Sequence, residues 1–141
     1  MEIPKSSLDL FSLDGRVALI TGGSKGLGEA MATALSGAGA DVAITSRNIG
    51  EAQAAASRIS AQTGGRVLSL KADATHRDQV EDSLAKALDT FGHIDIMVNN
   101  AGINIRAALV DLNDEDWDAV IATNLTGPMY YCRALGRHMI E

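Results

Sequence analysis

Three glycines at fixed spacing follow a short apolar run near the start of the chain. The run Val17–Ile20 leads through Thr21 to Gly22, Gly26 and Gly28, where a helical pattern begins. The first N–H groups of a helix are free and carry partial positive charge, so such a turn can hold an anion. Glycine also adopts positive φ and places no Cβ between backbone and ligand. The spacing therefore predicts a phosphate-binding turn for a nucleotide, in preference to an ordinary connection between strand and helix.

The turn differs from two familiar phosphate-binding signatures. Met31 stands where G-x-G-x-x-G has its third glycine, and no Gly-Lys-Ser/Thr sequence closes the turn as in a P-loop. Residues elsewhere in the chain must therefore indicate which nucleotide binds.

The end of the second apolar run bears on that choice. In dinucleotide-binding folds, an acidic residue here binds the ribose 2′-hydroxyl of NAD. The run Asp41–Thr45 is followed instead by Ser46, Arg47 and Asn48. The Arg47 guanidinium can hold a 2′-phosphate with two hydrogen bonds, and Lys25 in the glycine turn can reach the same phosphate. The alternative is that both cations are solvated surface charges. We expect NADP(H) rather than NAD(H).

Apolar runs alternate with helical patterns along the chain. The runs lack strict alternation of apolar and polar residues, which is typical of strands covered on both faces. We expect strands at about residues 16–21, 41–46, 66–71 and 94–98. Four helices are expected: from Leu27 to Ala38, from a capping box at Asn48 to before Gly64, from the N-cap Thr75 to Gly92, and from Asn113 onward. This alternation predicts an α/β fold with a Rossmann-type, doubly wound parallel sheet of strand order 3-2-1-4.

Two unusual loops should meet at one end of this sheet. The glycine turn follows the first strand, and Asn99-Asn100-Ala101-Gly102 follows the fourth. In the predicted order these strands are neighbours at the switch point, and ligands bind outside the carboxyl ends of the strands there.

Together these residues resemble the short-chain dehydrogenase/reductase family, from about Leu13 onward. The resemblance is carried by Thr21-Gly-x-x-x-Gly26-x-Gly28, by Asn99–Gly102, by Asp73 after the third strand and by Asn124. It implies that Asp73 and Ala74 approach the adenine and that Asn100 lies near the adenosine ribose. It also implies a cofactor-binding set of Gly22, Ser24, Lys25, Gly26, Leu27, Gly28, Ser46, Arg47, Asn48, Asp73, Ala74, Asn100, Ala101 and Gly102.

Asn124 has three interpretations. It begins an Asn-x-Thr glycosylation sequence, which we discount because no signal peptide precedes it. It is alternatively a helix asparagine bonded to nearby backbone. In the family the matching asparagine distorts its helix and holds a water in the proton relay, so the resemblance implies a catalytic role. Gly127-Pro128 just downstream favours a local break in the helix.

The family's catalytic serine and Tyr-x-x-x-Lys pair are not found in these residues. Tyr130 and Tyr131 are followed, four positions on, by Ala134 and Leu135. We therefore expect the chain to be the N-terminal half of a longer NADP(H)-dependent oxidoreductase acting on a carbonyl or alcohol, and to be inactive alone. The segment Gly102–Arg106 resembles gluconate 5-dehydrogenase-like members, which act on sugar acids. The alternative is a non-catalytic dinucleotide-binding module.

The length, net charge and apolar runs of the chain limit the classes of partner that it can have. The chain has 141 residues and a net charge of −6, which argues against nucleic acid as a partner. We see no targeting peptide and no run of membrane-spanning length, and we expect a cytoplasmic protein. We expect residues 1–12 to be a loosely held lead-in and 13–141 to form the cofactor-binding domain.

Several other residues are given structural roles. His76, His93 and His138 are scattered, so no metal site is expected. The single cysteine, Cys132, is expected to be a buried small hydrophobe. An apolar helical stripe is expected to be core or subunit contact in a homo-oligomer and consists of Trp117, Val120, Ile121 and Leu125.

Overall fold

The sheet has four parallel strands, and the computed structural model describes residues 7–140. The strands are β1 (Val17–Thr21), β2 (Asp41–Ser46), β3 (Val67–Lys71) and β4 (Ile96–Val98). Their order is β3-β2-β1-β4, and β1 pairs with β2 on one side and β4 on the other. The predicted fold class and strand order are confirmed.

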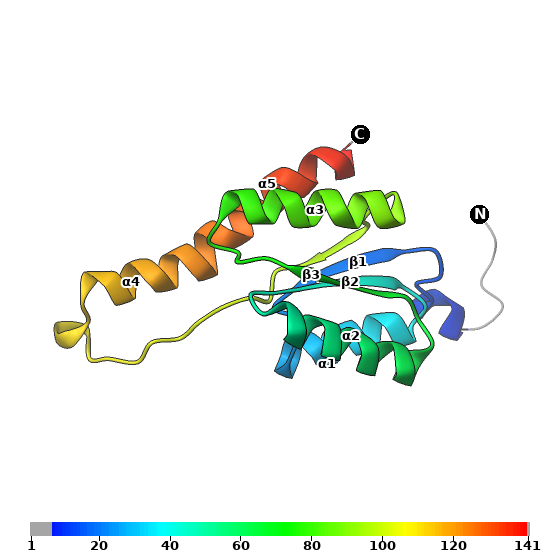
Figure 1. Cartoon of the computed structure of the whole chain (residues 1–141), viewed down its shortest axis with the longest axis horizontal. Coiled ribbons are helices and arrows are strands. Elements are labelled where there is room, and N and C mark those ends of the chain that lie inside the picture. Colours follow the sequence, from blue (N-terminus) through cyan, green and yellow to red (C-terminus); the bar gives the residue numbers. More distant parts are fainter. Residues whose placement is uncertain (1–6, 141) are drawn as a thin grey trace.

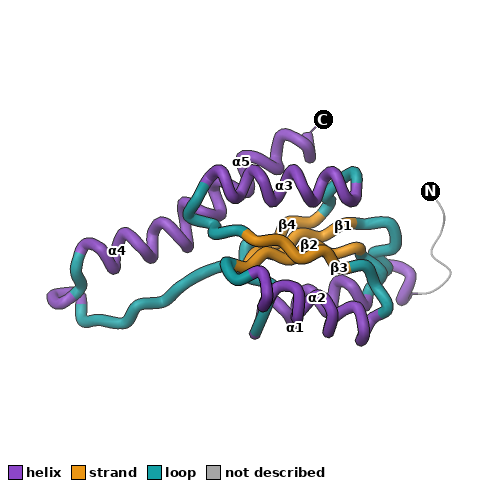
Figure 2. Tube along the Cα trace, in the orientation of Figure 1, coloured by secondary structure: helices purple, strands orange, loops and turns teal. Residues whose placement is uncertain are grey.

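Helices cover both faces of the sheet (Figure 1). One layer contains α1 (Gly26–Gly37) and α2 (Ile49–Thr63), and the other contains α3 (Arg77–Phe91) and α5 (Gly127–Ile140). Figure 2 shows the strands enclosed between the two layers. Both faces of the strands are thus shielded, which is why their apolar residues do not alternate with polar ones.

Successive residues of β1 belong to two separate hydrophobic core clusters, one on each face of the sheet. Val17 and Leu19 belong to the cluster that α3 and α5 complete, whereas Ala18 and Ile20 belong to the one completed by α1 and α2. All four side chains are buried. Because side chains alternate across a strand, a five-residue apolar strand supports both layers at once.

Helix ends follow the expected signals in part. The Asn48 side chain accepts a hydrogen bond from the Glu51 N–H at 3.3 Å and so caps α2. The expected N-cap of α3 is wrong: His76 holds that position without a side-chain cap bond. Thr75 instead donates its hydroxyl to Asp73 Oδ1 at 2.8 Å, a bond within the loop that competes with capping.

The expected last helix is divided into three parts. These are α4 (Asp114–Ile121), a π-helical turn η3 (Ala122–Thr126) and α5. The break lies immediately before Gly127-Pro128, and Asn124 is in its middle. With the loop after β4 and the 3-10 turn η2 (Leu109–Asp111), α4 projects from the body of the molecule (Figure 1).

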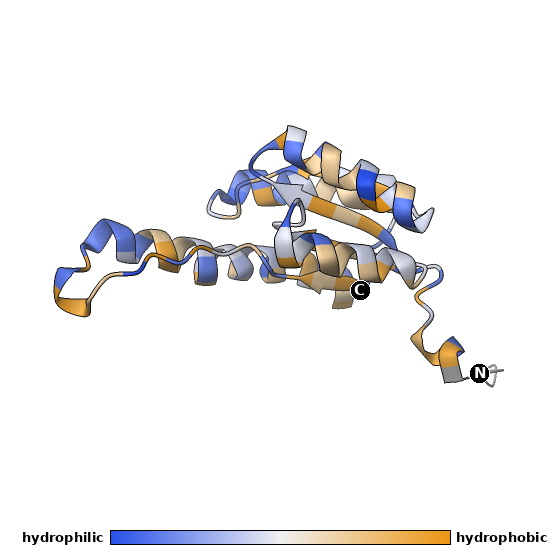
Figure 3. Ribbon diagram, turned by 90° about the horizontal axis from the view of Figure 1, so that it is seen from below, coloured by the Kyte–Doolittle hydropathy of each residue, from blue (hydrophilic) through white to orange (hydrophobic). Residues whose placement is uncertain are grey.

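Apolar residues are exposed at two opposite ends of the molecule, the N-terminal turn and the tip of the projecting arm (Figure 3). In the 3-10 helix η1 (Ser7–Phe11), Leu8 and Phe11 are exposed, and in η2 Leu109 and Val110 are almost fully exposed. Residues 1–6 of the expected lead-in lie outside the described residues, and its boundary with the domain stays a prediction. Of the apolar stripe, Trp117 is 53% exposed and Leu125 64%, so neither is core within this chain.

Candidate cofactor site

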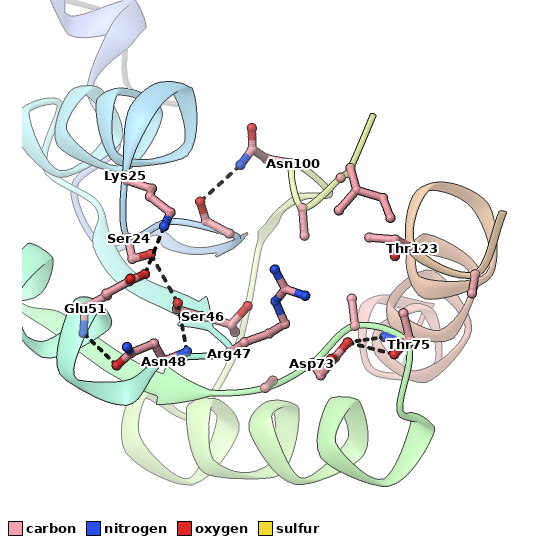
Figure 4. Close-up of a pocket in the computed structure, with 18 of the residues that line it drawn as sticks. Ser24, Lys25, Ser46, Arg47, Asn48, Glu51, Asp73, Thr75, Asn100 and Thr123 are labelled. Atoms are coloured by element: carbon pink, nitrogen blue, oxygen red, sulfur yellow. Dashed lines mark hydrogen bonds and ion pairs between the residues drawn. The ribbon is translucent and has the colours of Figure 1, made fainter. Parts of the chain in front are cut away.

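A cavity of about 820 Å³ lies at the carboxyl ends of the strands. The glycine turn, the ends of β2 and β3, the loop after β4, α4 and the π-turn all contribute to its walls (Figure 4). Most of the expected cofactor residues line it together: Gly22, Ser24, Lys25, Ser46, Arg47, Asn48, Asp73, Ala74, Asn100, Ala101 and Gly102. This is the edge at which the sheet order predicts a ligand.

The remaining expected residues do not line the cavity. Gly26 and Leu27 are exposed at the start of α1, and Leu27 is 70% exposed. Gly28 is buried behind the turn, where a Cβ would overlap the Gly22 carbonyl oxygen. Gly28 therefore serves close packing of helix against turn, while Gly22, at φ +64°, serves the shape of the turn itself.

A hydrogen-bond cluster joins the glycine turn to the loop after β4. The Thr21 hydroxyl oxygen accepts the N–H groups of Asn100 and Ala101, each at 3.0 Å. The Asn100 side chain donates to the carbonyl oxygens of Thr21 and Gly22 at 3.0 and 3.2 Å. The Asn100 amide is thus occupied in fixing the turn. The structural role of Thr21 was not foreseen, although its place in the glycine motif was a usable signal.

The Ser46 hydroxyl joins the glycine turn to the end of β2. It accepts a hydrogen bond from Ser24 Oγ at 3.2 Å and another from the Asn48 N–H at 3.2 Å. Ser24 and Ser46 are both buried. The two loops that present Lys25 and Arg47 are therefore connected through one buried side chain.

The charged residues of the cavity have different surroundings. The Arg47 guanidinium extends into the cavity, whereas the Lys25 ammonium turns toward Glu51 (Figure 4), with Nζ 3.2 Å from Oε2. Glu51 was not among the expected site residues. Partial burial raises the pKa of Asp73, but two hydrogen bonds from Thr75 and the nearby His76 and Arg47 outweigh it, so the pKa is lowered overall.

Both polar groups of the Asn124 side chain bind the loop after β4. Its Oδ1 accepts the Ile103 N–H at 2.9 Å, and its Nδ2 donates to the Ile103 carbonyl at 2.9 Å. Thr123 and Ala122 of the same π-turn line the cavity, as does Ile103. The side-chain amide is therefore a clamp between two walls of the site.

The tyrosines and the cysteine occupy distinct environments. Burial raises the pKa of Tyr131, and its hydroxyl lies 3.2 Å from Ser83 Oγ between α5 and α3. The expectation for Cys132 is wrong, since its side chain is exposed and its sulfur accepts a hydrogen bond from Asn99 Nδ2 at 3.3 Å. Tyr131 and Leu135 define the buried face of α5, and Cys132, the next residue after Tyr131, is turned away from it.

The described part of the chain has neither a cluster of metal-ligating side chains nor a membrane-spanning helix. Among residues 7–140, no group of three or more His, Cys, Asp or Glu side chains is placed to hold a metal ion. Within the same residues, no helix has the length and apolar character needed to cross a bilayer.

The residues present fit a dinucleotide. No side chain caps the start of α1, so its first N–H groups are open to a phosphate, and Gly22 leaves the approach free of a Cβ. The model of the family described as short chain dehydrogenase matches residues 16–141. The chain belongs to the short-chain dehydrogenase family.

Individual relatives agree with this family. Gluconate 5-dehydrogenase of Gluconobacter oxydans is 42% identical over 137 residues, which cover 94% of this chain and 51% of that protein. A short-chain type dehydrogenase/reductase from Mycobacterium marinum superposes with a TM-score of 0.91 at 41% identity, over 96% of this chain and 54% of that one. A metagenomic short-chain oxidoreductase in complex with NADP superposes with a TM-score of 0.84 at 36% identity, over 91% of this chain and 58% of that one.

This short-chain dehydrogenase chain spans about half the length of the curated relatives it matches. The similarity to the first of them agrees with the sequence resemblance to gluconate 5-dehydrogenase-like members. The relatives are named dehydrogenases and reductases, and the part they share with this chain includes the entire cavity described above.

Proposed function

We propose that this chain is the cofactor-binding half of an NADP(H)-dependent oxidoreductase. The observation that carries the proposal is the end of β2, where Ser46, Arg47 and Asn48 line the cavity and no acidic residue is present. An acid at this place would bind a ribose 2′-hydroxyl, whereas a guanidinium suits a 2′-phosphate. The NADP complex of the related metagenomic enzyme supports the same choice.

In this proposal each part of the cavity has a role. The glycine turn and the start of α1 hold the pyrophosphate, and Arg47 and Lys25 hold the 2′-phosphate. Asp73 and Ala74 border the adenine, while Asn100–Gly102 form the wall between adenosine and nicotinamide. Asn124 positions this wall through Ile103, and the second N–H and second oxygen lone pair of its amide can hold a water of a proton relay. The bound nicotinamide supplies or accepts the hydride.

We infer a sugar acid as the substrate, oxidised at a CH–OH group or reduced at a carbonyl. The support is the segment Gly102–Arg106 together with the relative named gluconate 5-dehydrogenase. The exposed stripe that includes Trp117 and Leu125 supports a homo-oligomer in which α4 packs against a second copy. The cytoplasmic location stays a prediction from the sequence.

Turnover by the whole gene product tests the proposal. The gene product is incubated with NADP⁺ or NADPH and a panel of sugar acids, polyols and ketones, and absorbance of the reduced nicotinamide is followed. We expect turnover with NADP(H) on at least one sugar acid. Binding of NADPH without turnover on any member of the panel would favour a dinucleotide-binding module, and absence of binding would refute the proposal.

A further inference from the structure

Four charged side chains line the cavity within the described residues. Lys25 and Arg47 are positive, and Glu51 and Asp73 are negative, so their formal charges sum to zero. A 2′-phosphate brings a charge between about −1.5 and −2 at neutral pH by analogy with other phosphate monoesters. A site that recognises such a group gains from a net positive charge, and this one has none before the ligand arrives.

Glu51 is the carboxylate placed to compete for the phosphate's cation. Its Oε2 lies 3.2 Å from Lys25 Nζ, and the ion pair runs from the first turn of α2 to the glycine turn. Both side chains retain solvent, with 77% of Lys25 and 43% of Glu51 exposed, so the pair is weak and can open. The Glu51 N–H donates to the Asn48 side chain, which fixes the backbone from which the carboxylate extends to this border of the cavity.

Asp73 does not compete in the same way. Its Oδ1 accepts the N–H and the hydroxyl of Thr75, at 3.0 and 2.8 Å, at the end of β3. These two bonds stabilise its charge within its own loop, and the nearby His76 and Arg47 add to that stabilisation, whereas the cation paired with Glu51 is Lys25. Glu51 lies beside Lys25 and Asn48 at one side of the cavity, while the Arg47 guanidinium extends toward its middle (Figure 4).

We propose that Glu51 is a specificity-determining residue that lowers the affinity for 2′-phosphorylated cofactors by holding Lys25 and by repelling the phosphate. The inference rests on the proposed NADP(H) function and deepens it. A 2′-phosphate must displace the Glu51 carboxylate from Lys25, whereas a ribose with a free 2′-hydroxyl leaves the ion pair intact. The preference of this site is therefore a balance, with Arg47 favouring the phosphate and Glu51 opposing it.

Binding of two cofactor fragments measures the effect of Glu51 on the affinity for the 2′-phosphate alone. The whole gene product is titrated calorimetrically with 2′-phospho-AMP and with AMP, which differ only in the 2′-phosphate. Glu51→Gln should tighten 2′-phospho-AMP about three- to tenfold, as expected for one charge acting on a phosphate across partly screened solvent. Binding of AMP should change less than twofold. The gain should shrink when ionic strength is raised, a response that a purely structural effect of the substitution would not give.

A matched control variant and a double-mutant cycle of Lys25 and Glu51 complete the test. Glu81→Gln removes the same charge from another exposed helical ion pair, with Arg77 at 2.7 Å, outside the cavity, and should leave both affinities unchanged. With Lys25→Met as background, Glu51→Gln should give a smaller gain, because Lys25 is no longer there to be released. Equal binding of the two fragments by the unaltered protein would refute the NADP(H) preference. A preference for 2′-phospho-AMP that Glu51→Gln leaves unchanged would refute only the role of Glu51.

Discussion

Asn124 and Ile103 are joined by two hydrogen bonds of 2.9 Å, one donated by each residue. The amide of a single side chain satisfies both the N–H and the C=O of one residue, as a neighbouring strand would. The partners are 21 positions apart in the sequence. The pair therefore ties the π-turn to the loop after β4, and it explains why an asparagine, whose amide both donates and accepts hydrogen bonds, stands at this position.

Asn124→Asp should open this clamp. The carboxylate keeps an acceptor for the Ile103 N–H but places a second acceptor against the Ile103 carbonyl, so one hydrogen bond becomes a repulsion. Because both hydrogen bonds are solvent-exposed, we expect a loss of about 0.5–1.5 kcal/mol in the free energy of unfolding. Urea denaturation of the variant measures it, and NADPH binding should weaken because Ile103 lines the cavity. Asn104→Asp, at an exposed position in the same loop, is the control and should be neutral.

Arg47→Asp should reverse the preference between cofactors. The substitution replaces the guanidinium that meets the 2′-phosphate by a carboxylate that repels it. We expect the Kd for NADPH to rise about tenfold or more, with the Kd for NADH changing less than threefold, since hydrogen bonds to charged groups are worth about 1.5–3 kcal/mol. Fluorescence titration with both cofactors measures the two values.

Lys86→Asp is the control for the change in charge. Lys86 is exposed on α3 and does not line the cavity, so this variant should bind both cofactors as the unaltered protein does. Equal losses of NADPH and NADH affinity in Arg47→Asp would contradict a role for Arg47 at the 2′-phosphate.

Gly28→Ala should disturb the glycine turn from behind. The added Cβ meets the Gly22 carbonyl and the Asn100 side chain, so either the turn or α1 must shift. We expect a loss of stability of about 1–3 kcal/mol from overpacking, together with weaker binding of NADPH. Gly136→Ala in α5 is the matched control, because nothing lies within 4 Å of its added Cβ. Removing a helical glycine there should stabilise the protein by about 0.5–1 kcal/mol. A Gly28→Ala variant as stable as the unaltered protein would show that the turn adapts.

Asp95 should contribute stability that disappears in acid. The Val17 N–H donates to it at 2.8 Å, and Arg16 and His93 bring positive charge, so its pKa is lowered. A lowered carboxyl pKa stabilises the folded protein at pH values above the pKa of the unfolded state, near 3.8. This stabilisation is lost as the pH falls toward the lower pKa of the folded state.

Denaturation at several pH values checks this prediction. Asp95→Asn should be less stable than the unaltered protein at pH 7, and the difference should narrow as the pH falls below about 4. Asp89→Asn, at an exposed position on α3, should show no such dependence. A difference that stays constant with pH would mean that Asp95 acts through shape rather than charge.

The sheet could be predicted because its signals are local. Each strand contains a short apolar run, and Gly64 and Gly92 end α2 and α3 in the left-handed conformation that glycine readily adopts. The Asn48 cap was likewise readable from its spacing to Glu51. The cofactor loops then followed from the strand order.

Contacts between distant segments were beyond the reach of sequence patterns. The pairing of Lys25 with Glu51 and the clamp between Asn124 and Ile103 join residues 21 or more positions apart. The Cys132 prediction was wrong because the apolar character of a residue does not tell which side of a helix it occupies. The Thr75 prediction was wrong because Asp73, two residues earlier, takes its hydroxyl.

The Asn124–Ile103 clamp also separates the tip of the projecting arm from the cofactor cavity. It closes the base of the projecting arm formed by the loop after β4, η2 and α4, and the tip at residues 104–113 lies beyond it. Insertions and replacements at the tip alter what the arm can contact while both clamp residues remain in place. The tip can vary from one related protein to the next while the cavity keeps its walls, because none of residues 104–113 lines the cavity, whereas Ala119 of α4 does.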